Sequence, residues 1–404
     1  MLNWTRQFNI FCLLDNQQYA GAIQRHELLL AAGASSFLSG SNAGWSELDA
    51  FLQGGWSFGH LSYELHSLMG PVSAPHRADP VDFPPFFFFR PQVLIRASAE
   101  NLSIEADDPE AVFRSLMAER SPDAVEVPGL ELSGRWSRGE YLALIDTLRA
   151  HIRRGDCYEI NFCQEFFAEG ARVDPHSLFR RLAAVSPNPF TAFYRLDDRY
   201  LLCASPERFL ARQGKTLISQ PIKGTAGRSA DPAADALLKA ALAASAKDRA
   251  ENVMVVDLVR NDLSRVCREG TVEVAELFGV YTYPQVHQMI STVQGELRPE
   301  VSFSEILKAT FPMGSMTGAP KKKVMELIDR YERSARGIFS GSVGYVAPSG
   351  DFDFNVVIRS LMYHAARAYL SYQVGSGITW YSDGAAEWEE CQLKAAAIKK
   401  VLTG

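Results

Sequence analysis

Short strand-like segments dominate two stretches of this 404-residue chain, and helical segments do not alternate with them regularly. The first stretch contains CYEINFCQEFF, TAFYRL, YLLCAS and RFLARQGKTLISQPI, and hairpin patterns return at 337–381. Period-2 segments separated by turn residues predict antiparallel strands, whereas regular β-α alternation would predict a parallel sheet. We therefore expect an α+β fold in which antiparallel sheets pack together with helices outside.

Helical spacing marks several of the connecting segments. Ser137 and Glu140 form a capping box, apolar side chains then recur at helical spacing, and Gly155 ends that helix. We predict one alanine- and leucine-rich helix at 230–260, a helix at KKKVMELIDRYE and a last helix at 384–402.

Two parts of the chain are distinguished by composition. A looser, acidic stretch at 105–134 separates an N-terminal part, residues 1–136, from the remainder, residues 137–404. A proline-rich segment at 70–91 ends in DFPPFFFFRP, which we interpret as a buried strand. We expect the two parts to form one intertwined structural unit.

Composition limits the classes of partner. Hydrophobic residues make up 47% of the chain and charged residues 22%, which predicts a sizeable core. The net charge is −6 and no basic block occurs, so nucleic acid is not an expected partner. The six cysteines form no C-x-x-C motif, which indicates buried free thiols. Without a signal-peptide pattern or a long apolar stretch, we expect a cytoplasmic protein without membrane contact.

A lysine lies in the constrained segment QPIKGTA, residues 220–226. Pro221 stiffens the backbone before Lys223, and Gly224 allows a turn or a close approach after it. A lysine in an open turn carries no functional signal. In a closed site, however, burial or neighbouring cations lower the pKa of a lysine and make it a nucleophile.

Carboxylates recur at helical spacing on two of the predicted helices. Glu387, Glu390 and Lys394 share one stripe of the last helix, and Asp248 and Glu251 share one stripe of the 230–260 helix. Spacing alone favours a solvated face with a Glu390–Lys394 pair. If the two helices face each other, the four carboxylates converge and require a cation, and an oxygen-only ligand set suits Mg²⁺.

Several further features are typical of anion binding, each with a structural alternative. GSMTGAPK at 314–321 is a glycine-rich loop before a helix, with Pro320 placed as the first helical residue. QVGSGIT at 373–379 puts glycines inside a strand, where a ligand or only a bulge explains them. Arg359 lies among apolar strand residues, and His287 is a polarising donor or a satisfied core histidine. Together these features indicate a small anionic substrate.

Five motifs resemble the chorismate-utilising enzymes: PIKGT, AKDRAENVMVVDLVRND, FPMGSMTGAPKKKVMELID, GSVGYV and VVIRSL, followed by a closing E-x-x-E helix. The resemblance is strong over 137–404 and weaker over 1–136, where GGWSFGHLSYEL resembles the N-terminal part of the family. It implies two large antiparallel sheets packed orthogonally as a sandwich, with helices outside and the active site in the cleft. Many members bind tryptophan in the N-terminal part.

The lysine of PIKGT is similar to that of family members that aminate chorismate at C4, whereas members that aminate C2 usually have PIAGT. The resemblance therefore implies formation of 4-amino-4-deoxychorismate from chorismate and ammonia, on the route to 4-aminobenzoate and folate. The alternatives are C2 amination with release of pyruvate, as in anthranilate synthases, isochorismate formation with water, and a sensor without catalysis.

The resemblance also implies residue roles. Lys223 matches the nucleophile that attacks C2, Glu207 the acid that protonates the leaving C4 hydroxyl, and His287 a histidine near the ring. Glu251 and Glu390 match direct Mg²⁺ ligands, and Asp248 and Glu387 match carboxylates that hold metal-bound water. The positions that match substrate contacts are Ser315, Thr317, Arg359, Gly375, Gly377 and Lys394.

Two positions depart from the family pattern. Glu159 stands where the family often has glutamine, in Y-E-I-N, and Asp248 stands where relatives often have glutamate. Isochorismate and salicylate synthases place a water-activating lysine near position 159. Glu159 therefore argues against water as the nucleophile, while the resemblance gives Glu159 itself no role.

The ammonia requires a source. Cys157 in GDCYE and Cys391 in EECQL do not resemble the glycine-flanked nucleophile turn of a glutaminase, and the sequence leaves no room for a pyridoxal-phosphate lyase domain. We therefore expect a separate glutaminase subunit that supplies ammonia and a separate lyase that consumes the product.

Overall fold

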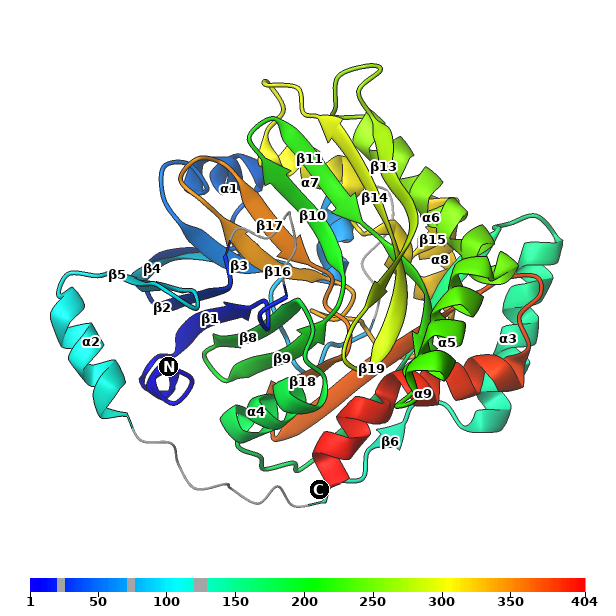
Figure 1. Ribbon diagram of the computed structural model, residues 1–404, viewed down its shortest axis with the longest axis horizontal. Coiled ribbons are helices and arrows are strands. Elements are labelled where there is room, and N and C mark those ends of the chain that lie inside the picture. The colour runs from blue at the N-terminus through cyan, green and yellow to red at the C-terminus, as the bar shows by residue number, and fades with distance from the viewer. Residues whose placement is uncertain (20–25, 71–76, 120–128, 404) are drawn as a thin grey trace.

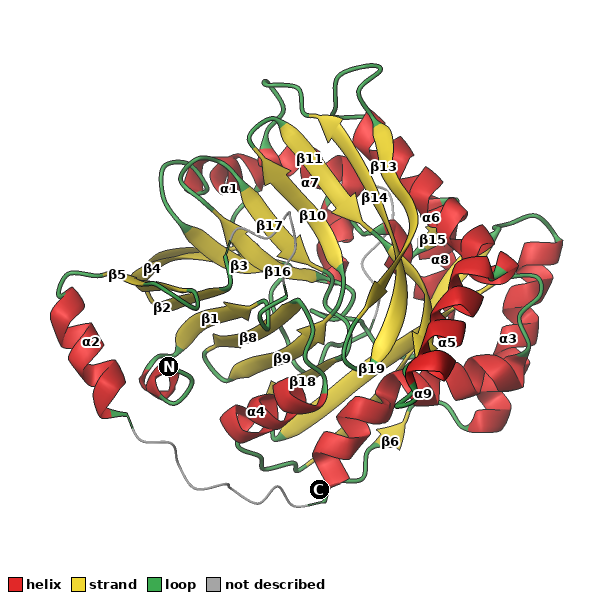
Figure 2. Cartoon of the chain, viewed as in Figure 1, coloured by secondary structure: helices red, strands yellow, loops and turns green. Residues whose placement is uncertain are grey.

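The computed structural model describes residues 1–19, 26–70, 77–119 and 129–403, and its strands join in one antiparallel hydrogen-bonded network (Figures 1 and 2). One run of neighbouring strands forms a first layer: β1 (Ile10–Asp15), β8 (Phe190–Leu196), β9 (Arg199–Ser205), β18 (Ser360–His364), β19 (Tyr369–Ile378) and β7 (Glu159–Glu169). Two short strands, β6 (Ser133–Gly134) and β15 (Gly318–Ala319), also pair with β7.

A second run forms the other layer: β3 (Ser57–Leu61), β16 (Ser342–Val346), β17 (Phe352–Asn355), β10 (Arg208–Gln213), β11 (Thr216–Gln220) and β14 (Val286–Glu296). Strand β14 also pairs with β12 (Ile222–Gly227) and β13 (Glu273–Thr282). In Figure 1 β10, β11, β13 and β14 rise steeply, whereas β1, β8, β9 and β18 run across the lower part of the view.

Two long strands join the layers. Strand β2 (Leu28–Ser39) pairs with β1 and with β4 (Phe86–Ala97), and β4 pairs in turn with β3 and β5 (Leu102–Glu105). The β2–β4 register shifts between Ala34 and Ser36, and such irregularities let a sheet bend. The expected α+β fold with extensive antiparallel pairing is confirmed.

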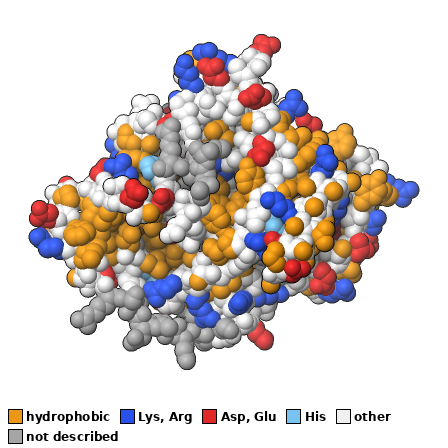
Figure 3. Space-filling model, in the orientation of Figure 1, with side chains coloured by type: hydrophobic (Ala, Val, Ile, Leu, Met, Phe, Trp, Pro, Cys, Tyr) orange, Lys and Arg blue, Asp and Glu red, His pale blue; other side chains and the backbone are white. Residues whose placement is uncertain are grey.

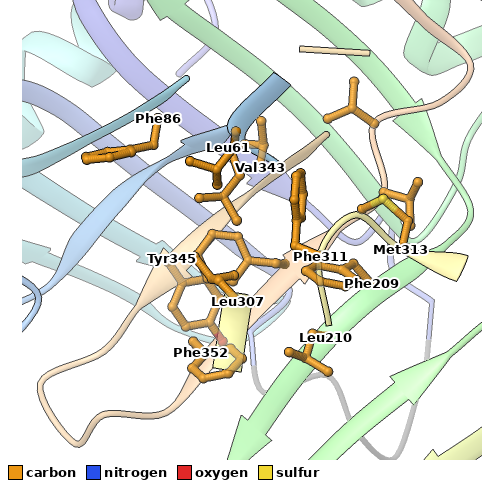
Figure 4. Close-up of a cluster of buried hydrophobic side chains, with 14 of the residues drawn as sticks. Leu61, Phe86, Phe209, Leu210, Leu307, Phe311, Met313, Val343, Tyr345 and Phe352 are labelled. Atoms are coloured by element: carbon orange, nitrogen blue, oxygen red, sulfur yellow. The ribbon is translucent and has the colours of Figure 1, made fainter. Parts of the chain in front are cut away.

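Strand alternation divides the core into two parts. On β1, Phe11 and Leu13 belong to a cluster with the helices that cover the first layer, whereas Cys12 belongs to the cluster between the layers. Figure 4 shows part of the inner cluster, where Leu61 and Val343 lie near Phe311 and Phe209. The predicted burial of DFPPFFFFRP is confirmed, because Phe86–Phe89 start β4 and are buried; residues 71–76 of that proline-rich segment lie outside the described residues.

The helices lie outside the sheet layers (Figure 2). The first layer is covered by α3 (Arg138–Arg153), α4 (Pro175–Val185), α8 (Lys321–Tyr331) and α9 (Gly384–Thr403). The inner cluster includes α1 (Trp45–Phe51), α6 (Ala246–Ser264) and α7 (Phe303–Thr310). The remaining helices are α2 (Pro109–Ala118), α5 (Pro232–Ala244), η1 (Trp4–Gln7), η2 (Tyr63–Leu68) and η3 (Gly314–Met316). No helix in the described ranges is long and apolar enough to cross a membrane.

Helix boundaries confirm some predictions and correct others. The capping box of Ser137 and Glu140 starts α3 as predicted. The single helix predicted at 230–260 is wrong: Ser245 adopts an extended backbone and caps α6 through Asp248 N–H, so α5 and α6 are separate helices. Pro320 is the N-cap of α8 with an extended backbone rather than its first helical residue.

The N-terminal part is interwoven with the rest of the chain. Strand β1 pairs with β8, and β3 pairs with β16, so strands of residues 1–136 continue the sheet formed by residues 137–404. The boundary at 136 and 137 stays a prediction. Figure 3 shows Lys and Arg side chains interspersed with Asp and Glu on the visible face, as the composition leads one to expect.

Candidate active site

Lys223 lies on β12 with its charged end in a buried ion pair. Its Nζ donates to Oε1 of Glu159, the first residue of β7, at 2.5 Å, and the two side chains are 11% and 3% exposed. Burial lowers the pKa of Lys223, but the charges of Glu159, Glu251 and Glu207 raise it, with a net upward shift. The sequence predicted that burial or nearby cations lower the pKa of Lys223, and this is wrong here because the nearby carboxylates raise it. The resemblance gave its partner Glu159 no role.

The backbone of Gly377 lies directly against this ion pair. A Cβ at Gly377 would lie 2.7 Å from Glu159 Oε1 and 3.0 Å from Lys223 Nζ, which leaves no room for a side chain. Gly377 pairs with Asn161 of β7, one strand position beyond Ile160. The backbone at Gly377 thus approaches the ion pair closely, and the approach to a ligand predicted for the glycines of QVGSGIT stays a prediction.

Gly224, which follows Lys223, also lies close to another segment, the start of α6. It has φ of +91°, a conformation that favours glycine, and a Cβ there would lie 2.9 Å from Asp248 Cβ. The turn after Lys223 is thus held directly against the start of α6. This contact explains in physical terms why a glycine follows the lysine in PIKGT.

Glu207 lies just before β10 and is 4% exposed. Burial raises the pKa of Glu207 to about 7, while a hydrogen bond to Ser315 and the positive charges of Lys223 and Lys394 act in the opposite direction. A carboxyl group with a pKa near neutrality is suited to donate a proton. The structure thus brings Glu207, Lys223, Ser315 and Lys394 into one electrostatic neighbourhood.

The four carboxylates expected to hold a metal share one neighbourhood. Burial lowers the pKa of Lys247, but Glu251, Glu387, Glu390 and Asp248 all act to raise it, and the net shift is upward. Burial raises the pKa of Glu251 to about 7, and Glu390 of α9 adds to that rise. The carboxylates of α6 and α9 therefore do act on one another, as the sequence left open.

These carboxylates do not stand in a preformed metal cluster. Within the described ranges, no three His, Cys, Asp or Glu side chains are close enough together to hold a metal ion. Glu387 is 3% exposed, and its buried Oε2 has no hydrogen-bond partner in this part of the chain. An orphaned buried oxygen beside other oxygen donors fits a hard cation such as Mg²⁺.

Lys394 connects α9 to the glycine strand. Its Nζ donates to Gly375 O at 2.8 Å and pairs with Glu390 Oε1 at 2.8 Å. Burial raises the pKa of Glu390, but Lys394 and Lys247 lower it, and the net shift is downward. The predicted i, i+4 pair is present, and it lies beside the site.

The glycine-rich loop contributes Ser315 but folds differently from a free anion loop. Gly314–Met316 form η3, and Gly318 and Ala319 pair with β7 at Ile160 and Glu159. The Thr317 hydroxyl is fully buried and donates to Met313 O at 3.1 Å. Thr317 therefore supports the loop in this structure, and its role as a substrate contact stays a prediction.

Arg359 lies in the connection between β17 and β18, not within a strand as predicted, and has φ of +52°. Burial lowers its pKa, while the charge of Glu207 raises it, so the two residues are electrostatic neighbours. A left-handed backbone is uncommon for a residue with a long side chain and is typical of functional positions.

The side-chain partners of His287 are Thr282 and Asp235, not Lys223. The ring is 1% exposed, with Nδ1 3.0 Å from Thr282 Oγ1 and Nε2 3.1 Å from Asp235 Oδ1 on α5. Both ring nitrogens have partners, which matches the interpretation as a satisfied histidine. Its role near the ring of a substrate stays a prediction.

Sequence reasoning missed a second buried ion pair behind the loop. Arg336 donates to Glu332 through Nε at 2.9 Å and Nη2 at 2.6 Å. It also donates to Met316 O at 2.6 Å and Asn161 O at 2.9 Å. The i, i+4 spacing of the pair was available in the sequence, but on a helix surface that spacing usually indicates an exposed pair.

A separate pocket lies where the N-terminal strands meet strands of both layers. Its lining residues come from β1, β2, β8, β16 and β17 and include Asp15, Leu29, Thr191, Val343 and Asp353. The sequence left open whether the tryptophan pocket of the family survives in the N-terminal part, and that question stays open.

Comparison with known proteins connects this geometry to a family. The chain is 42% identical over 288 residues to aminodeoxychorismate synthase component 1 of Klebsiella aerogenes, covering 70% of this chain and 62% of that protein. It is 33% identical over 358 residues to an anthranilate synthase component I-like protein of Synechocystis sp., covering 87% and 73%. The chain thus spans less than two thirds of the first of these relatives.

A solved structure supports the fold. Anthranilate synthase component I from Streptococcus pneumoniae superposes with a TM-score of 0.79 at 24% identity, covering 95% of this chain and 94% of that one. At this identity the likeness concerns the fold alone. The family described as chorismate binding enzyme matches residues 12–400, and this chain belongs to that family.

Proposed function

We propose that this protein aminates chorismate at C4 with ammonia and gives 4-amino-4-deoxychorismate. The observation that carries the proposal is the position of Lys223, buried and hydrogen-bonded at 2.5 Å to Glu159, beside Glu207 whose pKa burial raises to about 7. Aminodeoxychorismate synthases among the relatives support the choice of product.

The proposed reaction has two displacements. Lys223, as a free amine, forms a bond to C2, the ring double bonds shift, and the C4–O bond breaks as Glu207 protonates the departing hydroxyl to water. Ammonia then forms a bond to C4 as the C2–N bond breaks and Lys223 leaves as an amine. The C4 ammonium group loses one proton, which restores Glu207. Attack by Lys223 at C2 thus keeps ammonia from that carbon.

A divalent metal is part of the proposal. Glu251 and Glu390 would hold Mg²⁺ directly, and Asp248 and Glu387 through water, because these oxygen donors share one neighbourhood and Glu387 Oε2 has no hydrogen-bond partner among the described residues. Bound Mg²⁺ would offset the negative charge of the substrate carboxylates. Ser315, Arg359 and Lys394 supply further polar groups around the same space.

The partners follow from the need for ammonia. We propose that a separate glutaminase subunit supplies it, that a separate lyase consumes the product on the way to 4-aminobenzoate and folate, and that the reaction takes place in the cytoplasm. All six cysteines are free and buried, which suits a reducing compartment.

Product analysis tests the proposal. The purified chain is given chorismate, Mg²⁺ and an ammonium salt at alkaline pH, and the product is identified by mass spectrometry. We expect 4-amino-4-deoxychorismate with ammonium, and no product with glutamine until a glutaminase subunit is added. Anthranilate with pyruvate would replace the proposal with C2 amination, and isochorismate formed without ammonia would replace it with hydration.

A further inference from the structure

Glu159 is fixed at the edge of the proposed site by contacts on two sides. Its backbone pairs with Ala319 of β15. A Cβ at Gly318 would lie 2.1 Å from Glu159 O, so the backbones of the loop and the strand are in close contact here. Glu159 is 2% exposed, and its carboxylate contacts Lys223 and lies against the backbone of Gly377. The carboxylate is therefore held in one position before any substrate arrives.

Lys223 has a proton to lose before it can attack carbon. A protonated amine has no lone pair, and the carboxylates around Lys223 keep it protonated. Among the described residues, Glu159 is the acceptor within hydrogen-bonding distance of Nζ, at 2.5 Å. Glu207 is committed to the leaving hydroxyl, and Glu251 belongs to the carboxylates that would hold the metal.

We propose that Glu159 is a positioning residue that receives the proton of Lys223 when substrate closes the site. This inference rests on the proposed function. The N–H bond of the ammonium breaks and an O–H bond forms on Glu159, so an ion pair becomes a neutral amine and a neutral acid. Glu159 keeps this proton through both displacements and returns it when Lys223 leaves C2, so no other donor or acceptor is required.

Desolvation provides the driving force for this transfer. Burial disfavours the charged forms of both a carboxylate and an ammonium group. The pair is already nearly excluded from water, with side chains 11% and 3% exposed, and a substrate lying over it would remove the remaining water. The titratable groups that face Lys223 are Glu159 from β7, Glu251 from α6 and Glu207 from before β10.

The decisive variant is Glu159→Gln, which keeps the shape and removes the proton acceptor. We expect kcat for the C4 product to fall by about 100-fold or more near neutral pH, with KM for chorismate changed less than about 3-fold. Above pH 7 the rate of the variant falls less steeply than that of wild type, because solvent bases then take the lysine proton while Glu207 loses its own. Glu159→Asp, which keeps a carboxylate, restores part of the rate. In a Lys223→Ala background the same change has no further effect.

A matched control and a second readout separate this role from a structural one. Glu165→Gln changes another buried β7 glutamate, paired with Arg135 at 2.9 Å, and we expect it to leave kcat unchanged. Amine labelling of Lys223 at graded pH, read by peptide mass spectrometry without turnover, should show a lower pKa in Glu159→Gln.

The outcomes distinguish two failures. If Glu159→Gln is as fast as wild type or faster while labelling shows the lower lysine pKa, Glu159 only restrains the lysine and the inference is wrong. An equal loss in the Lys223→Ala background also refutes it, because Glu159 would then act elsewhere. If wild type makes no C4-aminated product at all, the proposed function itself fails, which is a different result.

Discussion

Two buried ion pairs flank strand β7, and they are built differently. At the start of the strand, Lys223 makes one hydrogen bond, to Glu159 at 2.5 Å. A few residues further along the strand, Arg336 makes two hydrogen bonds to Glu332 and two more to the carbonyls of Met316 and Asn161. Glu332 also accepts Cys163 N–H at 2.8 Å. The lysine pair is joined by one hydrogen bond, whereas the arginine pair is also bonded to three backbone groups, two of them on β7.

This difference indicates that the arginine pair supports the structure and that the lysine pair is able to take part in a reaction. An arginine offers five donors and does not deprotonate in proteins, so a fully bonded Arg336 can only hold its neighbours in place. A lysine is able to lose a proton, and Lys223 stands beside Glu207 and Glu251, whose pKa values burial raises to about 7. Carboxyl groups with pKa values near neutral pH are typical of active sites, so we expect the reaction at the Lys223 pair and not at the Arg336 pair.

The largest expected effect comes from removing the lysine. Lys223→Ala should lower the rate of C4 amination by at least about 1,000-fold, because the nucleophile is lost, while chorismate still binds. Rates are measured by product mass and binding by calorimetry. We expect some C2-aminated product, since C2 is then open to ammonia.

The control for this change is Lys215→Ala, an exposed lysine in the β10–β11 turn, which should leave activity unchanged. If Lys223→Ala makes the C4 product at the wild-type rate, the lysine is a positioning cation, and the distinction between the two ion pairs disappears.

Removing the arginine should instead reduce stability. Arg336→Met leaves the Glu332 carboxylate buried without a partner, and we expect the free energy of unfolding to fall by about 3–5 kcal/mol. Arg333→Met is the matched control, because Arg333 pairs with Glu140 at the surface and such a pair contributes about 0–1 kcal/mol. Denaturant unfolding measures both. Equal losses for the two variants would mean that burial does not distinguish the pairs.

The carboxylates of α9 provide the next test. Glu390→Gln removes a proposed direct Mg²⁺ ligand, and we expect activity at fixed Mg²⁺ to fall by about 100-fold with the helix still folded. Glu389→Gln, one position away and exposed, should have little effect. Mg²⁺ binding by calorimetry gives a readout besides turnover. Should only the melting temperature change, Glu390 would act through its surface pair with Lys394 alone.

Local sequence patterns predicted the elements of this site better than its partnerships. The acidic stripes and the glycine strand are present as predicted, because helical periodicity and glycine's backbone freedom are local properties. The solvated face that spacing favoured for the last helix is wrong at Glu387, which is 3% exposed. The Lys223–Glu159 contact joins residues 64 positions apart and depends on how β12 meets β7. No spacing rule reports such a contact.

Two errors have equally physical causes. The helix predicted at 230–260 contains Ser245, and its cap on Asp248 N–H is favoured over a continuous helix although the first half is rich in alanine and leucine. The isolated spacing of Glu332 and Arg336 predicted nothing, because only tertiary packing shows that both are buried.

The smallest effect concerns the acid beside the lysine. Burial raises the pKa of Glu207 to about 7, so Glu207 is increasingly ionised above that pH and is unable to protonate the leaving hydroxyl. We expect kcat/KM for chorismate to fall by about 10-fold per pH unit above 7, at constant free ammonia and saturating Mg²⁺. Deprotonation of Lys223 would act in the opposite direction and make the rate rise with pH.

Protonation of Glu251 would lower the rate below pH 7, because a protonated carboxyl no longer serves as a metal ligand and the pKa of Glu251 is about 7. Unfolding followed over the same pH range excludes a loss of structure as the cause. A profile that stays flat or rises up to pH 9 would show that proton delivery by Glu207 does not limit the reaction, and the lysine side of the pair would then set the rate.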